Sequence, residues 1–120
     1  MSLTVRHQPI PDVTPFDVER IVRRDFPEIQ FDSVMAVLKG YESNRERSRV
    51  QLATLKLARG NLDALRKYVN TAIQDFRDVI APAEYPEYSK LAFRVRERPV
   101  TEQHRIIDSD WTQYEDWLRR

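Results

Sequence analysis

The most regular hydrophobic pattern in the chain lies between Asn61 and Ile80. Its apolar residues are three or four positions apart, which is the spacing of one face of an α-helix. They are Leu62, Leu65, Val69, Ala72, Phe76 and Val79, with Ile73 and Ile80 widening the stripe. Asn61 is a favourable N-cap, Asp63 suits the positive end of the helix dipole, and Pro82 is expected to end the helix. The pattern predicts an amphipathic helix with Phe76 buried at the centre of its apolar face.

Two shorter helices are predicted nearer the N-terminus. The sequence Thr14-Pro15-Phe16-Asp17 combines a cap, a proline at the first helical position and an acid three residues after the cap, so a helix begins there and ends before Pro27. Its apolar positions are Val18, Ile21, Val22 and Phe26. A second helix over 31–41 has Val34, Val37, Leu38 and Tyr41 on one side. Residues 1–13 contain two prolines and no periodicity, so they are expected to be an extended lead-in.

Residues 45–59 predict a third helix with apolar side chains around much of its circumference, which is typical of a central helix. Gly60 and Asn61 leave two alternatives. One helix over 45–80 is possible at a cost of about 1 kcal/mol for the interior glycine. A glycine followed by a capping asparagine is instead a signal to stop one helix and start another. We expect this second arrangement, with helices at about 45–59 and 62–80 forming a central antiparallel hairpin.

The C-terminal third predicts an extended segment followed by a helix. In residues 91–96 apolar side chains alternate with arginines and an alanine, as in a strand, but no partner strand is predicted, so a loop packed on the bundle is expected. The helix over 101–118 has Ile107, Trp111, Tyr114 and Leu118 at helical spacing. The fold class predicted for residues 1–120 is a single all-α domain, a small bundle of about five helices.

Composition narrows the functional classes. The 120 residues contain no cysteine, which excludes disulfides and thiolate nucleophiles, and no apolar run approaches the roughly 20 residues that cross a bilayer. A cytoplasmic protein with no membrane partner is expected. The net charge is +1, but residues 41–60 and 89–105 each contain five basic and two acidic residues, whereas 106–120 contains two basic and four acidic. An uneven distribution of charge like this is typical of helix faces exposed to water, and it is also typical of surfaces that bind a partner.

Four sets of residues are candidates for chemistry or binding. Asp75, Asp78 and Glu84 can supply carboxylates to a divalent ion or act as acid and base, although acids on the outer face of a helix are ordinary. His104 and Asp108 are four residues apart, as in a carboxylate-oriented general base. Trp111, Tyr114 and Trp117 can anchor an interface, or Trp111 and Tyr114 can be core with Trp117 at the surface. The arginines that can contact phosphates are Arg45, Arg47, Arg49, Arg94, Arg96 and Arg98.

Three strings also resemble a known group. VQLATLKLARGNLDALRKYV, QDFRDVIAPAEYP and IIDSDWTQYEDWLRR are similar to a group of small uncharacterised bacterial proteins with the motifs D-[FY]-R-D-V-[IL]-x-x-A-E-Y-P and D-W-x-Q-Y-x-x-W-L. The likeness covers roughly residues 50–86 and 106–120. It implies a bacterial, stand-alone protein and adds no activity and no catalytic residue.

These observations favour a protein-interaction module without a cofactor, acting on another protein or on a second copy of itself. The usual nucleophile, zinc and phosphate-binding motifs are absent. The alternative is a small metal-dependent or acid/base hydrolase that uses Asp75, Asp78, Glu84 and His104. A weaker alternative is non-specific nucleic-acid binding through the arginines.

Overall fold

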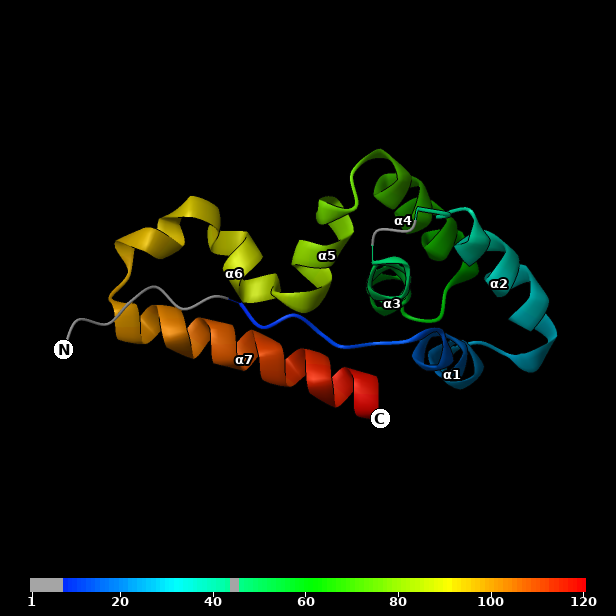
Figure 1. Ribbon diagram of the computed structural model, residues 1–120, viewed down its shortest axis with the longest axis horizontal. Coiled ribbons are helices and arrows are strands. Elements are labelled where there is room, and N and C mark those ends of the chain that lie inside the picture. Colours follow the sequence, from blue (N-terminus) through cyan, green and yellow to red (C-terminus); the bar gives the residue numbers. More distant parts are fainter. Residues whose placement is uncertain (1–7, 44–45) are drawn as a thin grey trace.

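The computed structural model describes residues 8–43 and 46–120, whose regular secondary structure is entirely helical. In chain order the elements are α1 Pro15–Asp25, η1 Glu28–Gln30, α2 Phe31–Lys39, α3 Arg47–Ala58, α4 Leu62–Gln74, α5 Arg77–Glu84, α6 Pro86–Leu91, η2 Ala92–Glu97 and α7 Val100–Arg119, η denoting a 3₁₀-helix. Helices α1 to α5 gather around α3, while α6, η2 and most of α7 extend away from this group along the long axis of the molecule (Figure 1). The molecule measures 54 × 29 × 23 Å.

Helix α3 is central, as predicted. It packs against α1, α4 and α5. Val50, Leu52, Ala53, Leu55 and Ala58 are buried, and they point around most of the helix. Thr54 is fully buried as well, and its hydroxyl donates a 2.6 Å hydrogen bond to the carbonyl of Gln51. The central position therefore agrees with a helix whose apolar residues point in most directions, so that its polar residues do not gather on one face.

The predicted start of α1 is confirmed. The backbone N–H of Thr14 donates to Oδ2 of Asp17 at 2.9 Å, which is half of a capping box. The helix ends at Asp25, and Phe26 is extended and buried ahead of Pro27. Helix α2 ends at Lys39, two residues earlier than predicted, and Tyr41 is buried beyond it.

The break between α3 and α4 is also confirmed. Arg59 and Gly60 have positive φ angles of 51° and 77°, and Oδ1 of Asn61 accepts a 2.9 Å hydrogen bond from the N–H of Ala64. Gly60 has a second role, because a Cβ atom there would lie 2.7 Å from the carbonyl oxygen of Asp25 at the end of α1. The glycine thus permits both the left-handed turn and the close approach of α1.

The long helix predicted over 62–80 is wrong, because the chain turns at Asp75. Oδ1 of Asp75 accepts a 3.0 Å hydrogen bond from the N–H of Arg77, and a side chain that bonds its own backbone in this way competes with helix continuation. Phe76 is consequently half-buried at the start of α5, not at the core centre, and Ile73 is 55 % exposed. Pro82 lies inside α5, which continues to Glu84.

The extended loop predicted over 91–96 is wrong too. Leu91 ends α6 and residues 92–96 belong to η2, so this part of the described chain is helical, and Val95 is buried. These short helices and the break at Asp75 raise the number of α-helices in the described residues to seven, instead of about five. Pro86 is at the first position of α6, where its missing N–H is not needed.

Helix α7 is tied to α1 at its C-terminal end. Nη2 of Arg20 donates to the carbonyl of Leu118 at 2.5 Å, and Nη1 of Arg24 donates to the carbonyl of Trp117 at 2.6 Å. The Arg24 guanidinium also lies 5.3 Å from the centre of the Trp117 ring. Trp117 packs against the core but is half-buried, as is Trp111, so the predicted contrast between a buried Trp111 and a surface Trp117 is absent. Two cations thus satisfy carbonyls that the helix itself leaves unpaired.

We expect Gly60→Ala to lower the free energy of unfolding by about 2 kcal/mol, because alanine disfavours positive φ and its Cβ would clash with Asp25. Urea denaturation followed by circular dichroism measures the change. Gly40→Ala is the control and should cost less, since Gly40 has a φ of −57° that alanine adopts readily and its Cβ would lie 3.0 Å from the carbonyl oxygen of Val37, a milder contact than the one at Gly60. An equal loss in both variants would contradict this account of Gly60.

Candidate functional site

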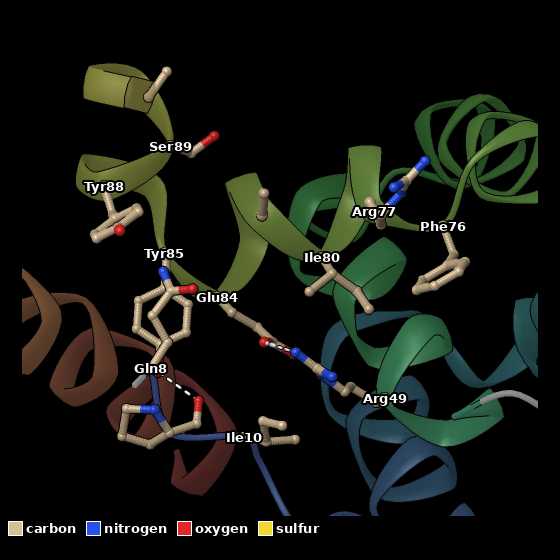
Figure 2. Close-up of a pocket in the computed structure, with 13 residues that line it drawn as sticks. Gln8, Ile10, Arg49, Phe76, Arg77, Ile80, Glu84, Tyr85, Tyr88 and Ser89 are labelled. Carbon is tan, nitrogen blue, oxygen red and sulfur yellow. Dashed lines mark hydrogen bonds and ion pairs between the residues drawn. The ribbon is translucent and has the colours of Figure 1, made fainter. Parts of the chain in front are cut away.

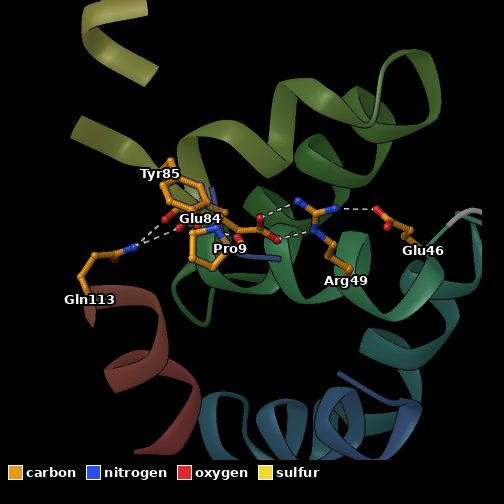
Figure 3. A network of polar contacts seen from close by, with 7 residues as sticks. Pro9, Glu46, Arg49, Glu84, Tyr85 and Gln113 are labelled. Carbon is orange, nitrogen blue, oxygen red and sulfur yellow. Dashed lines mark hydrogen bonds and ion pairs between the residues drawn. The ribbon is translucent and has the colours of Figure 1, made fainter. Parts of the chain in front are cut away.

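Residues from five parts of the chain meet at the turn between α5 and α6. We call Glu84, Tyr85 and Pro86 the α5–α6 corner. Glu84 is only 1 % exposed and forms a bidentate ion pair with Arg49 of α3, with Nε–Oε2 and Nη2–Oε1 distances of 2.8 Å (Figure 3). Nη1 of Arg49 donates to Oε2 of Glu46 at 2.6 Å. One guanidinium therefore joins a buried carboxylate to one near the surface.

Burial governs the electrostatics of this pair. Desolvation raises the pKa of Glu84 above its ordinary value, and the hydrogen bonds from Arg49 offset part of that effect. Those same bonds raise the pKa of Arg49, which stays charged. The two-point geometry is that of a guanidinium facing a carboxylate, so the corner is tied to α3 by a charge-assisted contact with little freedom of rotation.

Two further side chains bind the corner from other elements. The hydroxyl of Tyr85 donates to the carbonyl of Pro9 in the N-terminal segment, and Nε2 of Gln113 in α7 donates to the carbonyl of Glu84 at 3.1 Å (Figure 3). Tyr85 itself is buried. The polar groups at the C-terminal end of α5 thus have partners on α3, on α7 and on the segment preceding α1.

Helix α6 owes its start to α7. Oδ1 of Asp110 accepts from the N–H of Glu87 at 3.1 Å, and Oδ2 accepts from the N–H of Tyr88 at 2.9 Å. This carboxylate is an N-cap supplied from a distant helix, whereas local capping residues lie next to the helix they cap. The residue that caps α6 is therefore 22 to 23 positions away in the sequence from the N–H groups that it binds.

An apolar groove of about 780 Å³ lies beside the corner. Its walls come from the N-terminal segment, α5 and α6, and the Arg49–Glu84 pair lies between Ile10 and Ile80 (Figure 2). The groove is lined by Gln8, Pro9, Ile10, Arg49, Phe76, Arg77, Ile80, Ala81, Glu84, Tyr85, Tyr88, Ser89 and Ala92. Ile10 is 63 % exposed, so one wall of the groove presents a large apolar side chain to solvent.

The acidic cluster proposed from the sequence does not converge. Asp75 pairs with Arg77 at 2.9 Å, Asp78 is exposed on α5, and Glu84 is buried against Arg49. The hydrogen bonds from Arg77 lower the pKa of Asp75. Within residues 8–43 and 46–120, no group of three or more His, Asp or Glu side chains is placed to hold a metal ion.

His104 and Asp108 line a separate groove of about 700 Å³ along α7, which is formed by polar and charged residues of that helix. Nε2 of His104 is buried and has no hydrogen-bond partner in the described part of the chain. Tyr114, on the same helix, is fully buried and 5.5 Å from Trp117 between ring centres, so it belongs to the core and not to an exposed interface.

The predicted arginines lie on different elements. Arg45 is outside the described residues. Arg47 donates to the carbonyl of Glu42 at 2.7 Å. Arg49 of α3 is paired with Glu46 and Glu84. Arg94, Arg96 and Arg98 are exposed on or beside η2, which packs on α6.

Fold and site together define an all-helical protein with a preformed apolar groove beside a buried ion pair. No protein-family model, curated protein or solved structure matches the chain. None of the helices in the described ranges is long and apolar enough to span a bilayer. Neither the Arg49–Glu84 pair nor the groove is predicted from the sequence. The signal that could have indicated the pair is a charged residue, Arg49 or Glu84, next to buried apolar positions of its own helix.

We expect Asp110→Asn to lower the free energy of unfolding by about 1 kcal/mol, because an amide has one acceptor oxygen for the two N–H groups of α6. Hydrogen exchange at Glu87 and Tyr88 should accelerate more than in α4. Asp116→Asn, at an exposed position of the same helix, is the control. Unchanged exchange in α6 would show that Asp110 does not cap it.

Glu84→Gln should destabilise the fold by about 3 kcal/mol, because the Arg49 charge would lose its buried partner. Replacing both residues by methionine removes the charge together with its partner, and we expect the double variant to unfold within about 1 kcal/mol of wild type. Chemical denaturation of the three proteins measures both effects. A double variant as unstable as the single one would refute the pairing argument.

Proposed function

We propose that this protein is a protein-interaction module that binds a short segment of another protein in the groove between the N-terminal segment, α5 and α6. The observation that supports the proposal is the groove itself, with apolar side chains on every wall and a volume of about 780 Å³. Apolar grooves take the side chains of a partner segment as anchors, and the half-buried rings of Phe76 and Tyr88 supply aromatic surface of the kind enriched at such contacts.

The surroundings of the groove favour binding without rearrangement. The Arg49–Glu84 pair, the Asp110 cap and the Gln113 hydrogen bonds fix the elements that form its walls. A site held in its binding geometry loses little conformational entropy when a partner binds. The motif A-E-Y-P contains Glu84 and Tyr85, and the motif D-W-x-Q-Y contains Asp110 and Gln113. In this proposal, the polar contacts of these four residues hold the walls of the groove in place.

The proposal includes features that the sequence suggests. The protein acts in the bacterial cytoplasm, in line with the resemblance and with the absence of cysteine, and its α3 and α4 form an antiparallel hairpin. The hydrolase alternative has less support, because Asp75, Asp78, Glu84 and His104 lie in different surroundings. Nucleic-acid binding has less support because Arg49 is engaged with carboxylates.

Selection of random peptides displayed on phage tests the function. We expect wild-type protein to enrich peptides with large apolar residues. We expect Ile10→Glu to reduce the retained fraction about tenfold, because a partner would have to bury the new charge. Ile29→Glu is the matched control, since Ile29 is 91 % exposed and lies away from the groove. Equal retention by Ile10→Glu and wild type would refute the site.

Sedimentation separates the two kinds of protein partner. A monomer that retains peptides supports a different protein as the occupant. A dimer that Ile10→Glu converts to monomer, while Ile29→Glu leaves it intact, would make a second copy of the chain the occupant instead.

A further inference from the structure

We infer that the protein binds the surface of an anionic lipid bilayer through the exposed turn that η2 forms. The residues of this turn that carry the inference, which we call the η2 patch, are one apolar ring and the cations around it, namely Phe93, Lys90, Arg94, Arg96 and Arg98. None of them lines the groove of the proposed function, so this is a second surface. The expectation of no membrane partner rests on the lack of an apolar run that crosses a bilayer, and a protein that lies on the bilayer surface needs no such run.

Phe93 is the apolar element of the η2 patch. It is 76 % exposed, whereas Val95 is buried and anchors η2 to the rest of the molecule. Side chains three residues apart lie above one another in a 3₁₀-helix, so Phe93 and Arg96 share the outer side of the turn. A lone exposed apolar residue is ordinary on a protein surface. Phe93 differs because of the backbone that presents it and the cations beside it.

The backbone that presents Phe93 is strained. Ala92 has a φ of 50° and a ψ of −131°, a combination that residues with a Cβ atom rarely adopt. This residue joins α6 to η2, so its conformation sets the direction in which the turn leaves α6. Strained residues of this kind cluster at functional positions, where the surrounding structure holds them in place.

Neighbouring acids do not neutralise the η2 patch. Residues 87–105 contain five cations and three acids. Two of these acids, Glu87 and Glu102, are paired with Arg105 of α7 at distances of 3.2 and 2.7 Å. Within this segment, Glu97 is therefore the one acid left among the four cations of the patch. The patch keeps an excess of positive charge.

The cations of the η2 patch are available to an anionic partner. Lys90, Arg94 and Arg96 are exposed, and in the described stretches of the chain none of them has a carboxylate oxygen within the 4.0 Å of an ion pair. Arg98 is exposed as well, and Glu102, an acid on which its charge acts, is already bound by Arg105. Guanidinium groups match the oxygens of phosphate through parallel N–H bonds, so this side of the turn suits phosphate headgroups.

The position of the η2 patch favours a bilayer over a nucleic acid. The turn lies toward the end of the long axis opposite α2, and neither groove described above includes Phe93 or an arginine of the patch (Figure 1). Proteins that bind single strands follow the backbone along a groove and stack successive bases on several rings, whereas this patch has one ring. A protruding turn can instead meet a flat surface, with its cations at the headgroups and its ring at the boundary with the acyl chains.

Sedimentation with lipid vesicles tests the inference. The probes are vesicles of phosphatidylcholine and anionic phosphatidylglycerol in equal parts, and vesicles of phosphatidylcholine alone. We expect the protein to sediment with the anionic vesicles only. Raising the ionic strength to about 1 M, where the screening length falls to roughly 3 Å, should release it.

Two variants of the η2 patch measure its share of the binding. Replacing Arg94 and Arg96 by glutamine should lower the partition coefficient about thirtyfold, because each basic residue near an anionic surface contributes about fivefold. Phe93→Ala should lower it about tenfold, since the ring no longer leaves water. All three positions are exposed, so both variants should keep the circular dichroism spectrum of the wild type.

Each variant has a matched control. Replacing Arg66 and Lys67 by glutamine removes the same charge from exposed positions of α4. Phe16→Ala removes a ring of α1 that is 74 % exposed, close to the exposure of Phe93. Both controls should bind anionic vesicles almost as the wild type does.

Three outcomes would overturn the inference. The first is equal sedimentation with both kinds of vesicle, or sedimentation with neither. The second is a loss of binding in the controls as large as in the variants of the η2 patch. The third is binding of a fluorescent single-stranded oligonucleotide through the patch at physiological salt without binding to anionic vesicles, which would assign the cations to nucleic acid.

Discussion

The ion pair between Arg49 and Glu84 is the contact on which the arrangement of the outer helices depends. It joins α3, the centre of the apolar core, to the last residue of α5, where the chain turns into α6. An apolar contact at this position would hold the helices together but leave their rotation free. A two-point contact between planar groups fixes the direction as well as the distance, and with it the path of residues 85–97.

Helix α7 completes that arrangement by binding both the C-terminal end of α5 and the N-terminal end of α6. Asp110 accepts hydrogen bonds from the first N–H groups of α6, and Gln113 donates to the last carbonyls of α5. These two residues are three positions apart, so they lie on one face of α7. The helix thus acts as a template that satisfies a helix end and a helix start on either side of Tyr85.

Local signals in the sequence predicted local structure well. The capping of α1, the central place of α3 and the break at Gly60 all arise from residues that are neighbours in the chain. The break at Asp75 was missed because the apolar spacing continues through it, and periodicity does not register one aspartate that bonds its own backbone.

The α5–α6 corner and the groove could not be predicted in this way. The contacts that create them join residues 22 to 76 positions apart, namely Asp110 with Tyr88, Arg49 with Glu84, and Tyr85 with Pro9. Carboxylates such as Asp75, Asp78 and Glu84 look alike in a sequence, and only burial distinguishes them. Asp75, Asp78 and Glu84, which the sequence groups as one candidate cluster, therefore have different surroundings in the structure.

The contacts of Arg20 and Arg24 with the end of α7 have a consequence for the order of folding. They join residues 98 and 93 positions apart, so almost the whole chain must be closed into a loop before they form. The packing of α3 against α4 needs only a short turn. Folding should consequently begin in the middle of the chain and end with the docking of α7, which places completion of the groove's supporting contacts among the last events.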